Sequence, residues 1–340
     1  MSVHHIVADG WSVELINREL LSLYDDYVNG RPVSLRKLQI QYKDFAQWQN
    51  RLIESGVFDE DVEYWKAQLG QSLKPLSIEY DFDRDASSPS GRCKSVRAIF
   101  FDRELSGLRS LSHLYAASNF IVVLGAVKGL LRLLADQDDI SLVIPVSGRD
   151  RPELEGQCGL YLNLLILKDR IAKEMALGEI VLEVRETVLN AFKHQNVPFD
   201  LVYDAAGIQK MAGGRSVLDV EMDYHTFESM DERELAKTGL RVRQLDSRNL
   251  GRSNFDLCFI FSEKDDSLGL ELVYNPKLFS EARIGKYIKM LGWVLEYLRR
   301  QPRITIETLR DLLEVKILSE WREHRRHDFG KLLSSQKSLQ

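Results

Sequence analysis

The residues best suited to chemistry stand near the start of the sequence, in the string Val3-His4-His5-Ile6-Val7-Ala8-Asp9-Gly10-Trp11-Ser12. The string holds two imidazoles, and an imidazole, with an unperturbed pKa of about 6.5, can accept or donate a proton at neutral pH once its position is fixed. Gly10 stands just before a stretch with helical periodicity. Amides at the start of that helix would direct partial positive charge toward the same loop, where an oxyanion could be stabilised. The string therefore predicts a reaction centre.

These residues also have structural interpretations. Asp9 could act only as the N-cap of the helix that follows it. His4 suits the role of a packed, hydrogen-bonded histidine better than that of a catalyst. His5 and Asp9 are spaced as metal ligands can be, but no third cysteine, histidine or carboxylate lies nearby at ligand spacing. We therefore expect no metal site.

Helices must position this loop. A one-faced helix is predicted over residues 13–28, and Asn29-Gly30-Arg31-Pro32 ends it. Its apolar residues recur at steps of three and four: Val13, Ile16, Leu20, Leu23, Tyr24 and Tyr27. Two more helices are predicted over 42–49 and 58–69, with their aromatic residues in a core. The polar stretch 73–92, rich in Asp, Ser and Pro, is expected to be a surface loop or a connection between lobes.

A second unit begins near residue 94. Asn163 is the one strongly polar residue in its apolar strand 159–167, and burying the amide unpaired would cost about 1–3 kcal/mol. Asn163 must therefore find partners, either in neighbouring backbone or at a site. The other predicted strands are 94–101, 139–149 (ending in a Gly148-Arg149 turn), 217–227, 239–245, 254–262 and 268–274, and the predicted helices are 103–117, 119–135, 178–193 and 281–300.

Length and composition bound the class of protein. A chain of 340 residues, 44% hydrophobic and 29% charged, can bury a full core and corresponds to about two lobes. A net charge of −5 without a concentrated basic patch argues against nucleic acid as the partner. The three cysteines, Cys93, Cys158 and Cys258, are expected as buried thiols in a reducing compartment. The sequence shows neither a signal peptide nor a membrane span, so we expect a cytoplasmic protein.

Several short sequence motifs, taken in their order along the chain, together resemble those of a known protein family. They are His4-His5-x-x-x-Asp9-Gly10-Trp11-Ser12, Tyr42-x-Asp44-Phe45-Ala46-x-Trp48-Gln49, Pro145-x-x-Gly148-Arg149 with Glu153-x-x-Gly156 and Asn163, His194-Gln195-x-x-Pro198-Phe199, and Phe255-Asp256-Leu257 with Val273-Tyr274-Asn275. This series resembles the condensation domains of nonribosomal peptide synthetases, members of the chloramphenicol-acetyltransferase-like superfamily. The likeness covers residues 1 to about 315.

The resemblance implies an α/β fold of two lobes, each a mixed sheet with helices, and a site in the tunnel between them. Its implied activity is condensation, in which a carrier-bound aminoacyl amine attacks a carrier-bound acyl thioester and forms an amide. The implied partners are donor and acceptor peptidyl carrier domains and an adjacent adenylation domain, with no nucleic acid and no membrane. No cofactor is bound directly, since 4′-phosphopantetheine belongs to the carriers.

The resemblance also assigns roles to residues. His5 becomes the catalytic histidine, either as a general base or as a group that orients the amine, and the Gly10 amide faces the reacting carbonyl. Asp9 holds the loop by pairing with Arg149, while His4 and Asn163 are structural residues of the site. A positioned base contributes about 10²–10⁴-fold, whereas holding two reactants together is worth about 7–11 kcal/mol. We therefore expect positioning to outweigh proton abstraction.

One departure from the family pattern bears on activity. Family members carry a long stretch before the histidine box, including most of the first lobe's sheet, whereas here Met1 stands only two residues before Val3. We expect an incomplete first lobe over residues 1–72, a connection over 73–93, a second lobe over 94–313 and a tail over 314–340. The helices of the first lobe should then expose apolar surface. The alternative to a condensing enzyme is a truncated, inactive remnant or an interaction module of a larger synthetase.

Overall fold

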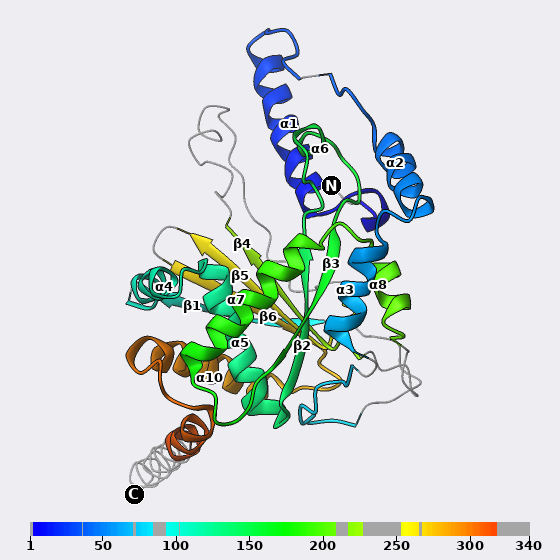
Figure 1. Cartoon of the computed structure of the whole chain (residues 1–340). Coiled ribbons are helices and arrows are strands. Elements are labelled where there is room, and N and C mark those ends of the chain that lie inside the picture. Colours follow the sequence, from blue (N-terminus) through cyan, green and yellow to red (C-terminus); the bar gives the residue numbers. More distant parts are fainter. Residues whose placement is uncertain are drawn as a thin grey trace, which may run out of the picture.

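The computed structural model describes residues 3–35, 37–70, 73–83, 93–101, 103–208, 217–226, 253–264 and 267–317. The strands of this part of the chain form one six-stranded mixed sheet in the order β1-β6-β5-β4-β2-β3 (Figure 1). Their bounds are β1 Lys94–Phe101, β2 Asp139–Val146, β3 Asn163–Arg170, β4 Val220–His225, β5 Leu257–Lys264 and β6 Ser267–Tyr274. Strand β4 runs parallel to both β2 and β5, and the remaining pairs are antiparallel. The predicted mixed α/β class is confirmed.

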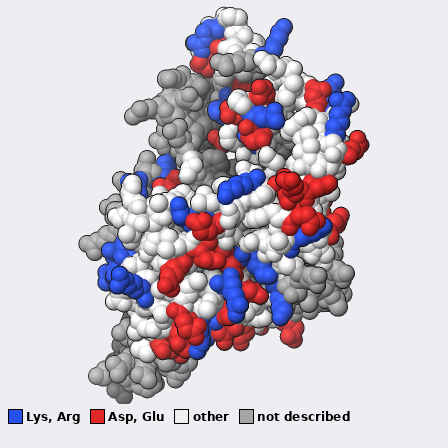
Figure 2. Space-filling view, in the orientation of Figure 1, with Lys and Arg blue, Asp and Glu red and all other residues white. Residues whose placement is uncertain are grey.

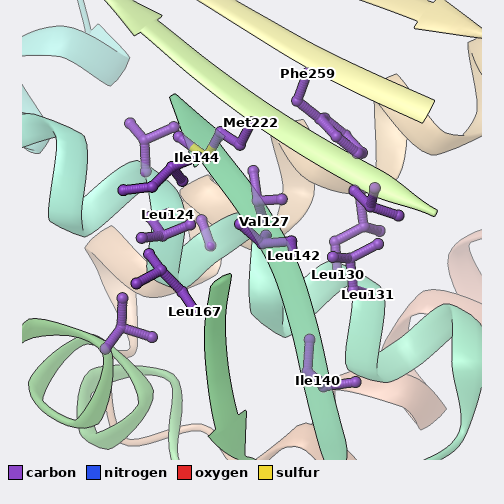
Figure 3. Packing of buried hydrophobic residues seen from close by; sticks show 14 of the residues in the cluster. Leu124, Val127, Leu130, Leu131, Ile140, Leu142, Ile144, Leu167, Met222 and Phe259 are labelled. Carbon is purple, nitrogen blue, oxygen red and sulfur yellow. The ribbon is translucent and has the colours of Figure 1, made fainter. Parts of the chain in front are cut away.

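Four helices form a layer over one face of this sheet: α4 (Arg103–Leu114), α5 (Asn119–Ala135), α7 (Leu177–Lys193) and α10 (Glu281–Arg300) (Figure 1). Helix α5 lies at the centre of the layer and is buried along nearly its whole length, from Ile121 to Arg132. A helix that is apolar on every side belongs inside a core. Figure 3 shows Leu124, Val127 and Leu130 of α5 packed against strands β2 to β5.

Two charged side chains of α5 are also buried. Lys128 is fully buried, and its Nζ donates to Leu167 O at 3.0 Å and pairs with Asp169. The Asp169 carboxylate also accepts a hydrogen bond from Thr187 Oγ1. A buried ion pair compensates its desolvation only with such additional hydrogen bonds. The pair therefore fixes the register between α5, β3 and α7.

Helices α1 (Gly10–Val28), α2 (Tyr42–Glu54) and α6 (Pro152–Glu155) lie beyond the end of strands β2 and β3, away from the main helical layer (Figure 1). Helices α3 (Asp59–Leu69) and α8 (Phe199–Ala205) pack together against the edge strand β3. As predicted, aromatic residues of α3 belong to the core. Trp65 is 1% exposed, and its Nε1 donates to His194 O at 3.0 Å. The same prediction for α2 is wrong, because α2 has no buried residue and its Trp48 is exposed.

The face of α1 differs from the prediction. Of the predicted apolar stripe, Leu20 is 60% and Tyr27 is 86% exposed, whereas Ser12, Leu15 and Asp26 are the buried residues. The helix contacts the β2–β3 connection through its first turns, and Asp26 near its end is covered by Arg31 and Ser34 of the segment that follows. The expected exposure of apolar surface by the first helices is present in α1. Other large apolar residues exposed in this region are Ile6, Val7, Trp11, Val13, Tyr24, Val28 and Val33.

Several element boundaries also differ. Residues 73–83 form no helix or strand, but Leu76 and Ile78 are buried in the main core, so this part of the connection is not a surface loop. A final helix covers residues 306–317, so the first residues of the expected segment 314–340 are helical. Cys93 and Cys258 are buried as predicted, whereas Cys158 is exposed, which corrects its assignment. The predicted strand 239–245 and residues 318–340 lie outside the described residues.

Figure 2 shows acidic and basic side chains of the described residues interspersed over the drawn face. No single described helix is long and apolar enough to cross a membrane; the pair 107–114 and 119–135, bent by 98°, meets the test by length and composition only.

Candidate active site

The histidine loop begins with a short 3₁₀ helix, η1 (His5–Val7). His4 caps this turn, because its Nδ1 accepts a hydrogen bond from the Ile6 amide at 3.1 Å. His5 Nδ1 lies 3.0 Å from Ala8 O. A carbonyl oxygen only accepts, so the proton of this contact resides on Nδ1. In the neutral ring, Nε2 therefore carries the free lone pair, and among the described residues it has no partner.

Asp9 is the N-cap of α1 and also an ion-pair partner, so both interpretations of this residue are correct. Its Oδ1 accepts from the Ser12 amide at 2.8 Å and from Ser12 Oγ at 2.6 Å. Its Oδ2 accepts from the Tyr161 amide at 3.1 Å. Burial alone would raise the pKa of Asp9, but the Ser12 hydrogen bonds, the Arg149 charge and the Tyr161 amide outweigh it and lower that pKa. The carboxylate is thus ionised at neutral pH.

Arg149 follows the end of β2 and joins the loop to the sheet. Its Nη2 lies 3.1 Å from Asp9 Oδ1 and 3.2 Å from Asp9 Oδ2, and the two side chains are only 1% and 3% exposed. Its Nη1 donates to two carbonyls of the β2–β3 connection, Leu154 O and Gln157 O. The guanidinium carbon lies 4.2 Å from the centre of the Tyr161 ring. The Asp9–Arg149 pair inferred from the resemblance is therefore present.

The β2–β3 connection forms the socket in which the loop sits. Gly148 has φ +61°, and a Cβ there would lie 1.9 Å from Tyr161 O, so only glycine fits. The Asp9 amide donates to Gly159 O at 3.2 Å, and Trp11 Nε1 donates to Glu155 O at 2.8 Å. Tyr42 of α2 donates to Leu160 O at 3.0 Å.

This use of the backbone explains a wrong strand boundary. Strand β3 begins at Asn163 rather than at the predicted residue 159. The amides of Gly159 and Tyr161 bond to Ser12 and Asp9, so these residues cannot also pair in the sheet. No feature of the sequence within 159–162 distinguishes such a socket from an apolar strand.

Gly10 is the first residue of α1, where an amide has no acceptor within the helix. A Cβ at Gly10 would meet no atom within 4 Å. The packing of the described residues therefore does not require glycine here, and the space beside the amide is open to another group. The described residues thus leave the His5 side chain exposed, and the Gly10 amide has no acceptor within the helix.

Asn163 serves a different part of the fold. Its Nδ2 donates to Gln195 O at 2.8 Å and to Val197 O at 2.7 Å, and its Oδ1 accepts from the Phe199 amide at 3.0 Å. Its partners are therefore the neighbouring backbone, which was one of the two possibilities left open. The structure thus brings His4, His5, Asp9, Gly10 and Arg149 together, and Asn163 holds the loop that precedes α8.

Two cavities of the described residues lie away from the histidine loop. One of about 660 Å³ lies beside α10 and the helix 306–317, and one of about 270 Å³ lies between α4 and α10; His5 lines neither. The side chains described also include no group of three or more histidine, cysteine or carboxylate residues that could hold a metal ion.

Three residues that complete the socket were not predicted from the sequence. Ser12, Gly159 and Tyr161 all contact Asp9 directly or through one another. Ser12 had a signal, since it stands three residues after an N-cap aspartate, where its amide must bond back to the cap. Gly159 and Tyr161 contact Ser12 and Asp9 through their backbone groups, and no sequence signal indicated these contacts.

The described strands and helices define a mixed α/β protein, and comparison with known proteins identifies the family. The Condensation domain family model matches residues 1–316, so the chain belongs to the condensation domain family. It is 30% identical over 328 residues to a linear gramicidin synthase of Brevibacillus parabrevis, covering 95% of this chain and 6% of that protein. It is 32% identical over 322 residues to tyrocidine synthase 2 of the same organism, covering 93% of this chain and 8% of that protein. The chain thus spans less than a tenth of either relative (6% and 8%).

Solved structures agree on the fold. The X-domain from teicoplanin biosynthesis matches with a TM-score of 0.80 and 22% identity, over 90% of this chain and 70% of that one. The four-domain nonribosomal peptide synthetase AB3403, bound to AMP and glycine, matches with a TM-score of 0.75 and 23% identity, over 90% of this chain and 24% of that one. At these identities the likeness concerns the fold alone.

Proposed function

We propose that this chain catalyses condensation: amide formation between a carrier-bound acyl or peptidyl thioester and a carrier-bound aminoacyl amine. In this step a C–N bond forms, the thioester C–S bond breaks, and the proton lost by the amine ends on the departing thiol. The phosphopantetheine arms belong to the substrates and are held by donor and acceptor carrier domains. An adenylation domain would supply the activated amino acid. Membership of the condensation family and the relatives' names support this proposal.

One structural observation carries the assignment of the site. The His5 ring is held by Ala8 O through Nδ1, so its exposed face presents Nε2 as an acceptor. That atom is suited to hold the attacking amine by one of its N–H groups or to take the proton from it. An aminoacyl amine with a pKa of about 8 is already partly neutral at pH 7. We therefore assign His5 mainly to orientation of the amine.

The second group in the proposal is the start of α1. The Gly10 amide lies at the positive end of the α1 dipole, directly after Asp9 of the histidine loop. Attack on a thioester places negative charge on its carbonyl oxygen, and an N–H group aimed at that oxygen stabilises it. We propose that the Gly10 amide plays this part, while the Asp9–Arg149 pair keeps helix and histidine loop in register.

The direct test is a transfer assay. The chain is mixed with one carrier domain bearing an acyl or aminoacyl thioester and a second bearing an aminoacyl thioester, over a panel of amino acids, and both carriers are followed by intact-protein mass spectrometry. The proposal predicts that the acceptor gains the donor's acyl mass while the donor returns to free thiol. Donor loss without acceptor gain, or no change above the protein-free control over the panel, would contradict it.

A further inference from the structure

Ser12 lies at the centre of the contacts that hold the histidine loop, although its side chain has no chemistry of its own in the proposed reaction. It is fully buried in the first turn of α1. Its Oγ lies 2.6 Å from Asp9 Oδ1, 2.9 Å from Gly159 O, 3.0 Å from the Gly159 nitrogen and 3.0 Å from Arg149 Nη2. The Ser12 hydroxyl therefore contacts Asp9 of the histidine loop, Arg149 after β2, and Gly159 of the β2–β3 connection.

Counting protons fixes the direction of these bonds. The hydroxyl has one proton and two acceptor lone pairs. The Gly159 amide and Arg149 Nη2 can only donate, so they occupy the lone pairs. Gly159 O already accepts from the Asp9 amide at 3.2 Å, whereas Asp9 Oδ1 is ionised and lies closest. The Ser12 hydroxyl therefore donates its proton in a hydrogen bond to Asp9 Oδ1, and its one donor and two acceptor positions are all used.

A short path connects this hydroxyl to both candidate catalytic groups. Asp9 is next in sequence to Ala8, whose carbonyl fixes the His5 ring through Nδ1. Asp9 is also next to Gly10, whose amide starts α1. Any rotation of the Asp9 peptide would therefore move the His5 ring and the Gly10 N–H relative to each other.

From this geometry we propose that Ser12 is a positioning residue: its hydroxyl sets the placement of the His5 ring against the Gly10 amide. The inference rests on the proposed condensation function for its kinetic consequence. A displacement of about 1 Å at a reacting group can cost about 100-fold in rate. Since Ser12 touches no reacting atom, its loss should affect turnover rather than substrate binding.

The test replaces Ser12 by alanine. In the carrier transfer assay we expect Ser12→Ala to lower kcat by about 10- to 100-fold and to leave KM for both carriers within about twofold. Ser22→Ala is the matched control, because Ser22 lies on the same helix and is exposed, with a long 3.4 Å contact to Ser34 Oγ. A Ser12→Ala protein with the turnover of wild type would overturn the inference.

A second readout separates positioning from general stability and does not depend on activity. The nitrogen chemical shifts of a labelled His5 ring report which nitrogen carries the proton. We expect mainly the Nδ1–H form in wild type and in Ser22→Ala, and a mixture of tautomers in Ser12→Ala. If Ser12→Ala does not fold, Ser12→Cys keeps a side chain of similar size and weakens the hydrogen bonds, and it should give the same mixture.

The outcomes distinguish this inference from the proposed function. If wild type transfers no acyl group but the tautomers shift as expected, the condensation proposal fails and the positioning of His5 by Ser12 stands. If wild type is active and neither turnover nor tautomer changes in the Ser12 variants, the function stands and the inference fails. A lowered melting temperature alone, with unchanged kcat and unchanged tautomer, would make Ser12 merely structural.

Discussion

At the scale of single residues, the candidate site depends on one buried ion pair. Asp9 comes from the start of the chain and Arg149 from the end of β2, and each is almost fully buried. Removing one member of a buried pair leaves an uncompensated charge, which costs about 3–5 kcal/mol. The same carboxylate that caps α1 therefore also joins the first helix to the sheet.

Asp9→Asn tests this pair. We expect a loss of about 3–5 kcal/mol in unfolding free energy at neutral pH, measured by urea denaturation. Asp25→Asn is the control, since Asp25 pairs with Arg31 on the exposed side of α1, where such pairs are worth about 0–1 kcal/mol. Equal losses in the two variants would show that burial of the Asp9 pair adds nothing.

The same pair predicts a pH dependence. The pKa of Asp9 is lowered in the folded protein from its ordinary value of 3.8. A lowered carboxyl pKa gives stability that is fully present above the ordinary value and is lost as pH falls through the folded value. Acid unfolding below pH 3.8 should therefore be shallower in Asp9→Asn than in wild type, by the contribution of this one group. Parallel acid limbs in the two proteins would contradict the assignment.

Two glycines test the socket by comparison. Gly148 and Gly30 have nearly the same backbone angle, φ +61° and +62°, so alanine at either carries a similar conformational cost of about 1–2 kcal/mol. At Gly30 the new Cβ would meet nothing, whereas at Gly148 it would lie 1.9 Å from Tyr161 O. We expect Gly148→Ala to lower the melting temperature well beyond Gly30→Ala. Similar melting temperatures in Gly148→Ala and Gly30→Ala would mean that the β2–β3 connection can move to accommodate the new Cβ.

At the scale of elements, α1 shows what periodicity predicts and what it leaves open. The spacing of its apolar residues predicted the helix, which extends from Gly10 to Val28. It did not predict the buried face, because the helix packs by its first turns onto a loop rather than by a stripe onto a sheet. By contrast, the predicted stripe of α10, from Ile284 to Leu298, is buried, since that helix lies flat on the sheet.

Two leucines of α1 separate its packed and open faces. Leu15 is 9% exposed and Leu20 is 60% exposed. Leu15→Ala should cost about 2–5 kcal/mol, as expected for a buried leucine. Leu20→Ala should change stability by no more than about 0.5 kcal/mol. Chemical denaturation of both variants checks this, and a large loss at Leu20 would mean that the exposed face is covered in solution.

At the scale of the whole molecule, sequence patterns predicted the strands and the long helices best. Buried strands such as 139–146 appear as continuous apolar runs, because they are covered by helices. Contacts between residues far apart in the chain were harder to predict from the sequence. The socket around Asp9 is built from backbone groups of residues 159–161, and the partners of Asn163 lie more than thirty residues away in the chain (|i−j| 32, 34 and 36). Such pairings follow from topology rather than from local pattern.

The measurement that tests the account most directly compares His5→Ala with His113→Ala, an exposed histidine of α4, in single-turnover transfer between loaded carriers. Because the His5 side chain is exposed and, within the described part of the chain, bonds only to Ala8 O, its loss should leave the melting temperature unchanged. We predict that His5→Ala slows amide formation by at least about 100-fold while His113→Ala retains the wild-type rate. A folded His5→Ala protein that forms amide at the wild-type rate would contradict the central claim.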